Sequence, residues 1–381
     1  MEGNDKIKRY TITWFDRFEC LAGKCPESCC RGWVIPLSPE DIERFKKERG
    51  LLGFALFLAT GARIREKFNP GSRSCPFWRR DGLCTLQRKR GHDFIPWTCQ
   101  SYPRFYRNFG DFEECCLDLS CIEAARLFIE NRGSVDMSVT EADPVTRVCS
   151  TNDDRAYLDF LLSQRSAMSA AAGIAITDEI CRKLFEYAKF LQNRFMSGAC
   201  NNYGDMTFEV FLKHLAEDDA LLLESGSGKA SLFPLSPHIL SGFLSSSLNH
   251  KRLRRTSPTL YKMLDRADRA LARFIKVPGS WQLAADAKCR DNPHLPDILG
   301  QYLGYYLFQY FLRTYETYSF RKQVALGICH VNMIFLLAVT SKQDILTADD
   351  MARIIAAYNR RAYFNDIITD EMYRVFEDGI K

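Results

Sequence analysis

Cysteine is the residue type in this sequence whose spacing could do chemistry. The chain has 381 residues and 15 cysteines, and one third of its length holds two thirds of the thiols. These ten are Cys20, Cys25, Cys29, Cys30, Cys75, Cys84, Cys99, Cys115, Cys116 and Cys121. An isolated cysteine behaves as a small buried apolar residue. A dense group instead indicates a metal or iron–sulfur site or a disulfide framework, with chance clustering as the third alternative.

Disulfide bonds are disfavoured by the start of the chain, its length and its odd number of cysteines. The first residues, MEGNDKIKRY, lack the apolar segment of a secretion signal. The chain is also far longer than the small secreted domains that depend on disulfides. We therefore expect a cytoplasmic protein with reduced thiols, in which the group of cysteines binds metal or does redox chemistry.

The densest part of the group reads C-x4-C-x3-C-C from Cys20 to Cys30. Thiolates this close in sequence can meet at one centre only where the backbone is irregular, and Gly23, Pro26 and Gly32 fit that requirement. Four thiolates can hold a zinc ion or an iron–sulfur cluster. The sequence has no C-x2-C knuckle of a zinc ribbon, and adjacent cysteines suit a larger cluster better. A centre that only stabilises the fold is the alternative to a reactive one.

Further cysteines occur in two stretches with recognisable local chemistry. Cys75-Pro-Phe-Trp and Asp81-Gly-Leu-Cys84 contain turn residues, so their cysteines could flank a hairpin. The second stretch is Trp97-Thr-Cys99-Gln-Ser-Tyr102-Pro-Arg104. Its arginine could bind a carboxylate through two hydrogen bonds. Local packing and a surface ion pair are the alternative roles of the tyrosine and arginine.

In combination, these motifs resemble the flagellin lysine-N-methylase family, which is related to small bacterial proteins described as zinc- or iron-chelating. The resemblance runs from Phe18 to Arg126. The matching motifs are Phe18-x-Cys20-x4-Cys25-x3-Cys29-Cys30-x2-Trp33, Cys75-Pro-Phe, Asp81-Gly-Leu-Cys84, Thr98-Cys99-x2-Tyr102-Pro-Arg104 and Leu119-Ser-Cys121-x-Glu-Ala-Ala-Arg126. The later part of the chain is compatible in length and helical character but carries no motif of the family.

The resemblance implies a methyltransferase that moves methyl groups from S-adenosylmethionine to lysine amines of flagellin, with a cysteine-bound [4Fe-4S] cluster. Tyr102 and Arg104 become the candidate catalytic residues. Cys115 and Cys116 lie outside the pattern. The metal candidates at matching positions are Cys20, Cys25, Cys29, Cys30, Cys75, Cys84, Cys99 and Cys121. These exceed the four thiols that one cluster needs, and we favour Cys25, Cys29, Cys30 and Cys99 as the cluster set.

The sequence departs from both common ways of binding the methyl donor. Radical enzymes that use it carry C-x3-C-x2-C, whereas here the second thiol of a C-x3-C is followed directly by Cys30. The one glycine-rich stretch, residues 226–229, has a serine-rich context that predicts a flexible loop. A lysine amine must lose its proton before it can accept a methyl group, so a base is needed. The candidate bases are Tyr102, Asp118, His92 and His330, although His330 is expected in an apolar helix of the core.

The net charge of +5 is unevenly spread. Residues 63–107 contain 11 Lys or Arg against 3 acidic residues. This run is either a solvated face or a surface for an anionic partner. Nucleic acid ranks last among partners, because the sequence has no helix-turn-helix, RNA-recognition or C2H2 pattern. The most apolar stretch, residues 324–340, is shorter than the roughly 20 residues of a membrane span and is expected to be a buried helix.

The elements that must position these residues divide the chain in three. Residues 1–133 are Cys-rich and irregular, residues 134–155 form a polar linker, and residues 156–381 form an all-helical domain. Helices are expected after Ser38-Pro39, over residues 120–131, and after Thr177, Ser257-Pro258 and Thr347. The predicted fold is therefore mainly α, with an irregular N-terminal metal-cluster region.

Two function classes remain besides nucleic-acid binding. The first is the methyltransferase described above. The second is a non-catalytic zinc- or iron-binding module joined to a helical partner-binding domain.

Overall fold

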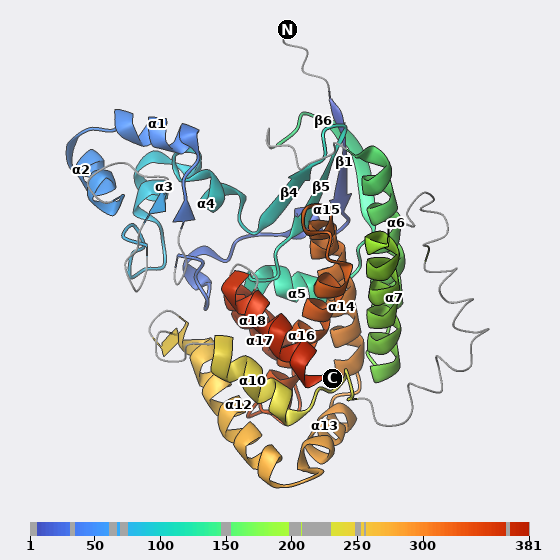
Figure 1. Cartoon of the computed structure of the whole chain (residues 1–381). Helices are drawn as coiled ribbons and strands as arrows, with labels where there is room; N and C mark the ends of the chain where they lie inside the picture. Colours follow the sequence, from blue (N-terminus) through green and yellow to red (C-terminus); the bar gives the residue numbers. More distant parts are fainter. Residues whose placement is uncertain are drawn as a thin grey trace.

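The structure is a computed structural model, and Figure 1 shows the whole chain. It describes residues 6–30, 35–60, 67–68, 75–145, 154–197, 207, 230–247, 253–254, 257–362 and 366–380. The glycine-rich stretch at 226–229 lies outside the described residues.

The fold is mainly α, as the sequence predicts. Helices follow one another through the larger part of the chain and share one extended core. They are α5 (Ile122–Glu130), α6 (Arg155–Ala172), α7 (Asp178–Met196), α10 (Pro237–Ser247), α12 (Pro258–Lys276), α13 (Ser280–Asp291), α14 (Leu295–Tyr310), α15 (Thr314–Thr317), α16 (Phe320–Val339), α17 (Ala348–Ala362) and α18 (Asp366–Gly379). Predicted helix starts are confirmed by capping: the amide of Ile180 donates to Thr177 Oγ1 at 3.2 Å, and the amide of Asp350 donates to Thr347 Oγ1 at 3.1 Å.

The central helix of this core is α16. Figure 1 shows it surrounded by other helices, and it packs against α7, α14, α17 and α18. Its 20 residues make it long and apolar enough to cross a membrane by length and composition, but 89% of its apolar window is buried inside the protein. The prediction of a buried helix is confirmed, since His330 and Asn332 on it are fully enclosed.

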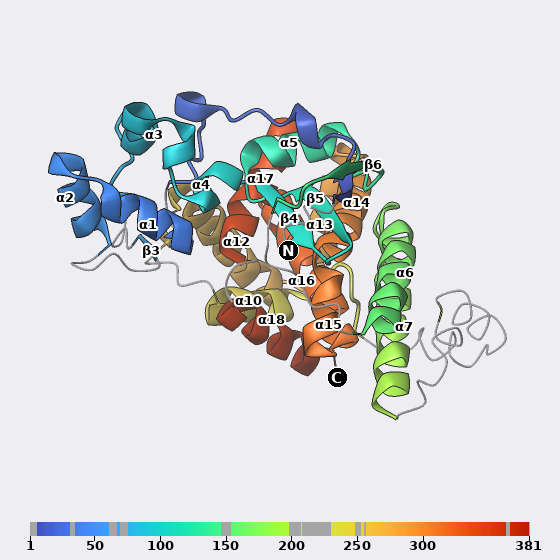
Figure 2. The ribbon, with the colours of Figure 1, turned by 90° about the horizontal axis from the view of Figure 1, so that it is seen from above.

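A four-stranded sheet covers one end of the helical core (Figures 1 and 2). Its strand order is β4 (Arg104–Asn108), β5 (Phe112–Leu117), β1 (Ile7–Ile12) and β6 (Met137–Ala142). β1 runs parallel to β5, with Lys8 opposite Phe112, and antiparallel to β6. The sheet is joined to α14 by Tyr305, whose hydroxyl donates to the carbonyl of Leu117 at 2.7 Å.

This sheet differs from two sequence expectations. Residues 1–133 are expected from the sequence to be irregular, and residues 134–155 to be a linker, but three strands of this sheet (β1, β4 and β5) lie in the first range and β6 lies in the second. β6 is polar and largely exposed because it is an edge strand, and this composition resembles that of a linker. β5 is buried along its whole length, so it lacks the alternation that identifies a half-exposed strand.

A separate small lobe extends away from the helical core (Figures 1 and 2). It contains α1 (Pro39–Lys47), α2 (Gly50–Ala59), α3 (Thr85–Arg90), α4 (Trp97–Ser101) and the short pair β2 (Ile35–Pro36) and β3 (Lys67–Phe68). It has its own apolar core, which includes Phe45, Leu56 and Phe77. The predicted start of α1 is confirmed by a reciprocal cap between Ser38 and Asp41. Gly50 is the first residue of α2.

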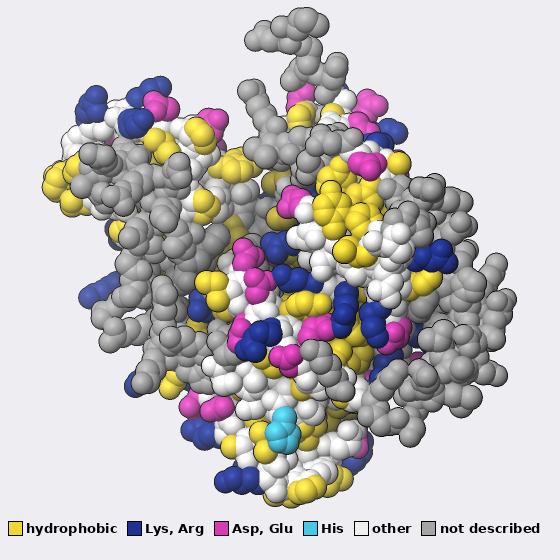
Figure 3. Space-filling view, in the orientation of Figure 1, with side chains coloured by type: hydrophobic (Ala, Val, Ile, Leu, Met, Phe, Trp, Pro, Cys, Tyr) yellow, Lys and Arg dark blue, Asp and Glu magenta, His cyan; other side chains and the backbone are white. Residues whose placement is uncertain are grey.

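The outer helix of the lobe, α2, exposes large apolar side chains. Leu51, Phe54 and Leu58 are 88%, 60% and 59% exposed. Apolar side chains are visible at that edge of the lobe in Figure 3.

Candidate functional site

A cavity of 390 Å³ lies between the small lobe and the helical core. All eight cysteines of the predicted metal set line it, and so do Tyr102 and Arg104. The eight are Cys20, Cys25, Cys29, Cys30, Cys75, Cys84, Cys99 and Cys121. The two cysteines outside the family pattern, Cys115 and Cys116, are elsewhere, buried in β5. The structure therefore gathers the motif cysteines at one place and separates them from the other two.

The first cysteine loop is held close to the turn that precedes Cys84. A Cβ atom on Gly23 would lie 2.8 Å from the carbonyl oxygen of Asp81, and one on Gly82 would lie 2.9 Å from the Cα of Gly23. Gly82 also has a positive φ of +80°, which favours glycine. Only glycine at both positions allows the two backbones to touch. This contact brings the Cys20–Cys25 segment and Cys84 to the same cavity.

The remaining cysteines are placed by backbone hydrogen bonds and helix starts. The amide of Cys75 donates to the carbonyl of Cys30 at 2.8 Å, which joins the first loop to the second. Cys84 forms an isolated bridge with Trp78, in agreement with the predicted hairpin-like turn. Cys99 lies in α4, and Cys121 is the N-cap residue directly before α5.

Burial, and after it the neighbouring thiols, raise the pKa of four of these cysteines, Cys25, Cys75, Cys99 and Cys121. Burial raises the pKa of Cys75 to about 11 and that of Cys121 to about 12. A hydrogen bond to Cys30, followed by burial, raises the pKa of Cys29. After burial, proximity to the Cys29 thiol is a further cause of the raised pKa of Cys25, Cys75, Cys99 and Cys121, so Cys29 is central in the group. A bound positive centre would reverse this balance by favouring the thiolates.

The cysteines suit a thiophilic metal or an iron–sulfur cluster by type, number and burial. Their thiols line the cavity but do not converge into a ligand shell around one point. Within the described part of the chain, no three or more His, Cys, Asp or Glu side chains are arranged to hold a metal ion. The structure thus brings the donors to one cavity without closing them on one point.

Tyr102 and Arg104 both reach the cavity, but their neighbours differ. The Tyr102 hydroxyl lies 3.0 Å from Ser120 Oγ, and burial raises its pKa. The Arg104 guanidinium lies over the rings of Phe15 and Phe18 and donates to the carbonyl of Phe18 at 3.3 Å. Arg104 therefore supports the start of the first cysteine loop through packing. Tyr102 is the buried hydroxyl of the site.

The other candidate bases are placed differently. His92 lines the cavity, whereas Asp118 is buried behind it and accepts from the amide of Ser120 at 2.7 Å. His330 is in the helical core, 2.8 Å from the Tyr358 hydroxyl. The prediction that His330 is a core histidine is confirmed.

Sequence reasoning missed Arg360, which enters the cavity from α17. Its guanidinium donates to the carbonyls of Glu27, Ser28 and Ser120 at 2.7, 3.3 and 3.2 Å. It also lies 3.8 Å from the Glu27 carboxylate, which in turn accepts from the Thr259 hydroxyl of α12. Through these contacts, α12 and α17 of the helical core hold the loop that carries Cys25, Cys29 and Cys30 in place. The sequence offers no signal for this, because the partners are far apart along the chain.

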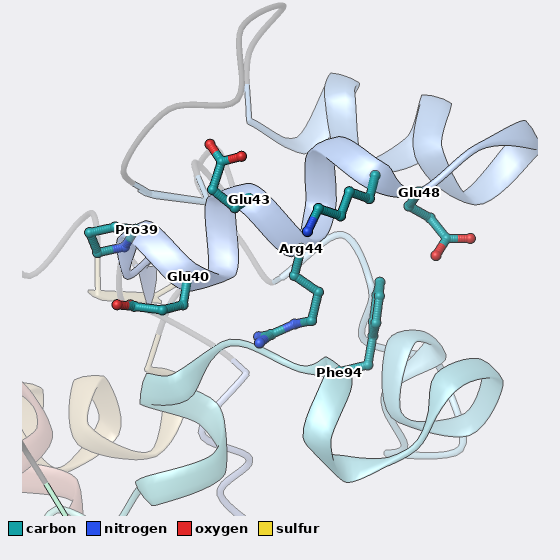
Figure 4. A pocket seen from close by; sticks show the side chains of 7 residues that line it. Pro39, Glu40, Glu43, Arg44, Glu48 and Phe94 are labelled. Atoms are coloured by element: carbon teal, nitrogen blue, oxygen red, sulfur yellow. The ribbon is translucent and has the colours of Figure 1, made fainter. Parts of the chain in front are cut away.

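A different hollow lies on α1, and none of the cysteines line it. Figure 4 shows that its carboxylates, from Glu40, Glu43 and Glu48, point in different directions. Arg44 is already engaged by Asp41 and by the carbonyl of Ile95. These side chains do not converge, so the cysteine-lined cavity is the candidate site.

Comparison with known proteins finds partial similarity to lysine-N-methylases. The chain is 24% identical over 143 residues to the lysine-N-methylase of Salmonella typhimurium and to that of Salmonella choleraesuis. The match covers 35% of this chain and 36% of each relative, so it spans about a third of their length. The chain is also 26% identical over 128 residues to the flagellar biosynthetic protein FliU of Salmonella muenchen, which covers 31% of this chain and 76% of that protein. No family model and no solved structure matches the chain.

Proposed function

We propose that this protein is a lysine N-methyltransferase that acts on flagellin, with S-adenosylmethionine as methyl donor and a [4Fe-4S] cluster held in the cysteine-lined cavity. The observation that carries the proposal is that all eight motif cysteines line one cavity, together with Tyr102. The partial similarity to proteins named lysine-N-methylase supports the reaction type.

The proposed cluster ligands are Cys25, Cys29, Cys30 and Cys99. They come from the first loop and from α4, so a cluster there would join the helical core to the small lobe. When bound, such a four-cysteine cluster would supply electron-transfer chemistry. Cys20, Cys75, Cys84 and Cys121 are then left for a structural or second metal role.

The cavity provides conditions that a lysine methyl acceptor needs. A lysine amine normally has a pKa near 10.4, and only its neutral form can attack a methyl sulfonium. Arg104 and Arg360 line the cavity, and their positive charge disfavours a further cation beside them. Transfer of the amine from water into the cavity would act in the same direction. Tyr102 is the proposed group that orients the neutral amine, through the hydroxyl that contacts Ser120; its raised pKa keeps that hydroxyl protonated, so it acts as a hydrogen-bonding group.

The test is methyl transfer with protein purified and reconstituted without oxygen. Flagellin and methyl-labelled S-adenosylmethionine should give label on lysine. Tyr102→Phe should lower the rate by about tenfold if the hydroxyl orients the amine by a hydrogen bond. Absence of label on lysine from the reconstituted wild-type protein would refute the proposed reaction.

A second function is kept because of one observation, that the donors are not closed on a single point. The protein would then be a non-catalytic zinc- or iron-binding module with a helical partner-binding domain. Analysis of iron, zinc and acid-labile sulfide separates the two functions. Iron with sulfide supports the enzyme, whereas zinc without sulfide supports the module.

A further inference from the structure

A second groove, of 400 Å³, adjoins the cysteine loop and is formed by α12, the end of α16 and α17. Buried or half-buried apolar side chains of Met263, Leu337, Leu346 and Ile354 line its inside. Its rim carries four cations, and three of them are exposed. They are Lys262 and Arg266 on α12, Lys342 after α16, and Arg353 on α17. We call this feature the cationic groove.

The four rim cations have no ion pair or hydrogen bond with any residue in the ranges that the structure describes. On the same helix, Arg269 does pair with an acid, Asp265, at 2.8 Å. The two acids that line the groove are occupied. Glu27 contacts Thr259 and Arg360, and Asp350 accepts from the amide and hydroxyl of Thr347. The groove therefore keeps an excess of positive charge that its own residues do not balance.

The apolar inside of the groove, together with the cations spread along its rim, favours one kind of ligand. A small anion such as phosphate would use the cations and leave the apolar inside exposed to water. An acidic polypeptide segment can cover the apolar inside with an apolar side chain and place its carboxylates at the rim. The groove also adjoins the candidate site, because Glu27 lines both the groove and the cysteine cavity.

We propose that the cationic groove binds an acidic, apolar-containing segment of the protein substrate, while the substrate lysine enters the cysteine cavity. This assignment rests on the proposed function for the identity of the ligand as substrate. The groove supplies affinity and orientation, and the neighbouring cavity supplies the reaction. Binding through the groove is electrostatic at its rim, so it weakens as salt is added.

The test measures peptide binding by fluorescence anisotropy with the full chain and without methyl donor. The probes are a fluorescein-labelled peptide of alternating Glu and Leu and its Lys-for-Glu counterpart. Lys262→Glu with Arg266→Glu should weaken binding of the acidic peptide by about tenfold or more. The matched control is Arg273→Glu with Lys276→Glu, which makes the same charge change at exposed positions of α12 outside the groove. The control should bind as the wild type does, and the basic peptide should not bind.

Three results would overturn the groove as a peptide site. They are equal loss of binding in both double variants, no loss in the groove variant, and full displacement of the peptide by inorganic phosphate at concentrations near physiological ionic strength. Thermal unfolding checks that both variants fold. If the charge-reversed groove variant does not fold, Lys262→Gln with Arg266→Gln replaces it.

The results of the peptide-binding test and of the methylation test can be told apart. If the peptide binds as expected but flagellin is not methylated, the reaction is wrong and the groove remains a site for an acidic segment. If flagellin is methylated and the groove variant has an unchanged KM for flagellin, the reaction stands and the assignment of the groove to the substrate is wrong.

Discussion

Arg360 donates a hydrogen bond to the backbone carbonyl of Glu27 at 2.7 Å, although 333 residues separate them. This bond ties the last turn of α17 to the first cysteine loop. The Arg360 side chain is 12% exposed, so the interaction is largely shielded from water. The position of the loop therefore depends on the helical core as well as on its own sequence.

Arg360→Gln should loosen this loop. The variant loses a largely buried guanidinium that donates hydrogen bonds to three backbone carbonyls. We therefore expect the free energy of unfolding to fall by about 2–4 kcal/mol. Thiol-reagent labelling of metal-free protein, followed by mass spectrometry, should show faster modification of Cys25 and Cys29. The control is Arg269→Gln, which removes an exposed surface ion pair and should cost under about 1 kcal/mol. Equal labelling rates in the two variants would contradict the role of Arg360.

Gly82→Ala should disturb the contact between the two cysteine loops. Gly82 and Gly279 both have positive φ, +80° and +76°, so alanine at either position carries a backbone cost of about 1–2 kcal/mol. A Cβ at Gly279 would meet no atom within 4 Å, whereas one at Gly82 would meet Gly23. Urea unfolding should therefore show a larger loss for Gly82→Ala, by about 1–3 kcal/mol. A similar loss in both variants would mean that the close approach is not needed.

The helices and the grouping of cysteines were accessible from the sequence for physical reasons. Caps such as Ser38 and Thr177 satisfy amides of their own helix, so the signal is local. The eight motif cysteines form a recognisable spacing pattern. The hydrogen bonds from Arg360 to the first cysteine loop leave no local pattern in the sequence, because they join residues at opposite ends of the chain.

The sheet could not be predicted for a related reason. β5 contains two buried glutamates, which normally argue against a buried strand. Glu113 pairs with Arg9 at 3.0 Å, and Glu114 pairs with Arg165 of α6 at 2.5 Å. Both partners come from other elements, so the compensation appears only in the folded chain.

The cavity cysteines and the β5 cysteines should differ in their effect on bound metal. Cys29→Ser removes the thiol at the centre of the group, and we expect iron or zinc per chain to fall by half or more. Cys115→Ser changes a thiol buried in the sheet core and should keep the metal content while lowering stability. Elemental analysis of protein purified without oxygen measures the first effect, and thermal unfolding measures the second. Loss of metal from Cys115→Ser alone would place the metal site in the sheet.

His330 should make the fold sensitive to acid. Burial lowers its pKa to about 3 in the folded chain, against about 6.5 in the unfolded chain. The unfolded state therefore takes up a proton as the pH falls below about 6.5, while the folded state stays neutral until about 3. The contribution of neutral His330 to the free energy of unfolding is therefore complete above about pH 6.5, and it is lost as the pH falls from about 6.5 to about 3.

Urea unfolding at about pH 7.5 and about pH 5 measures this loss. Between them, the wild type should lose about 2 kcal/mol more than His330→Gln, which can still bond the Tyr358 hydroxyl but cannot titrate. The control is His294→Gln, whose native side chain is 90% exposed, and which should keep the wild-type slope. Overall destabilisation by the core substitution does not affect the comparison, because each variant serves as its own reference. A wild-type slope in His330→Gln would assign the acid sensitivity to other groups.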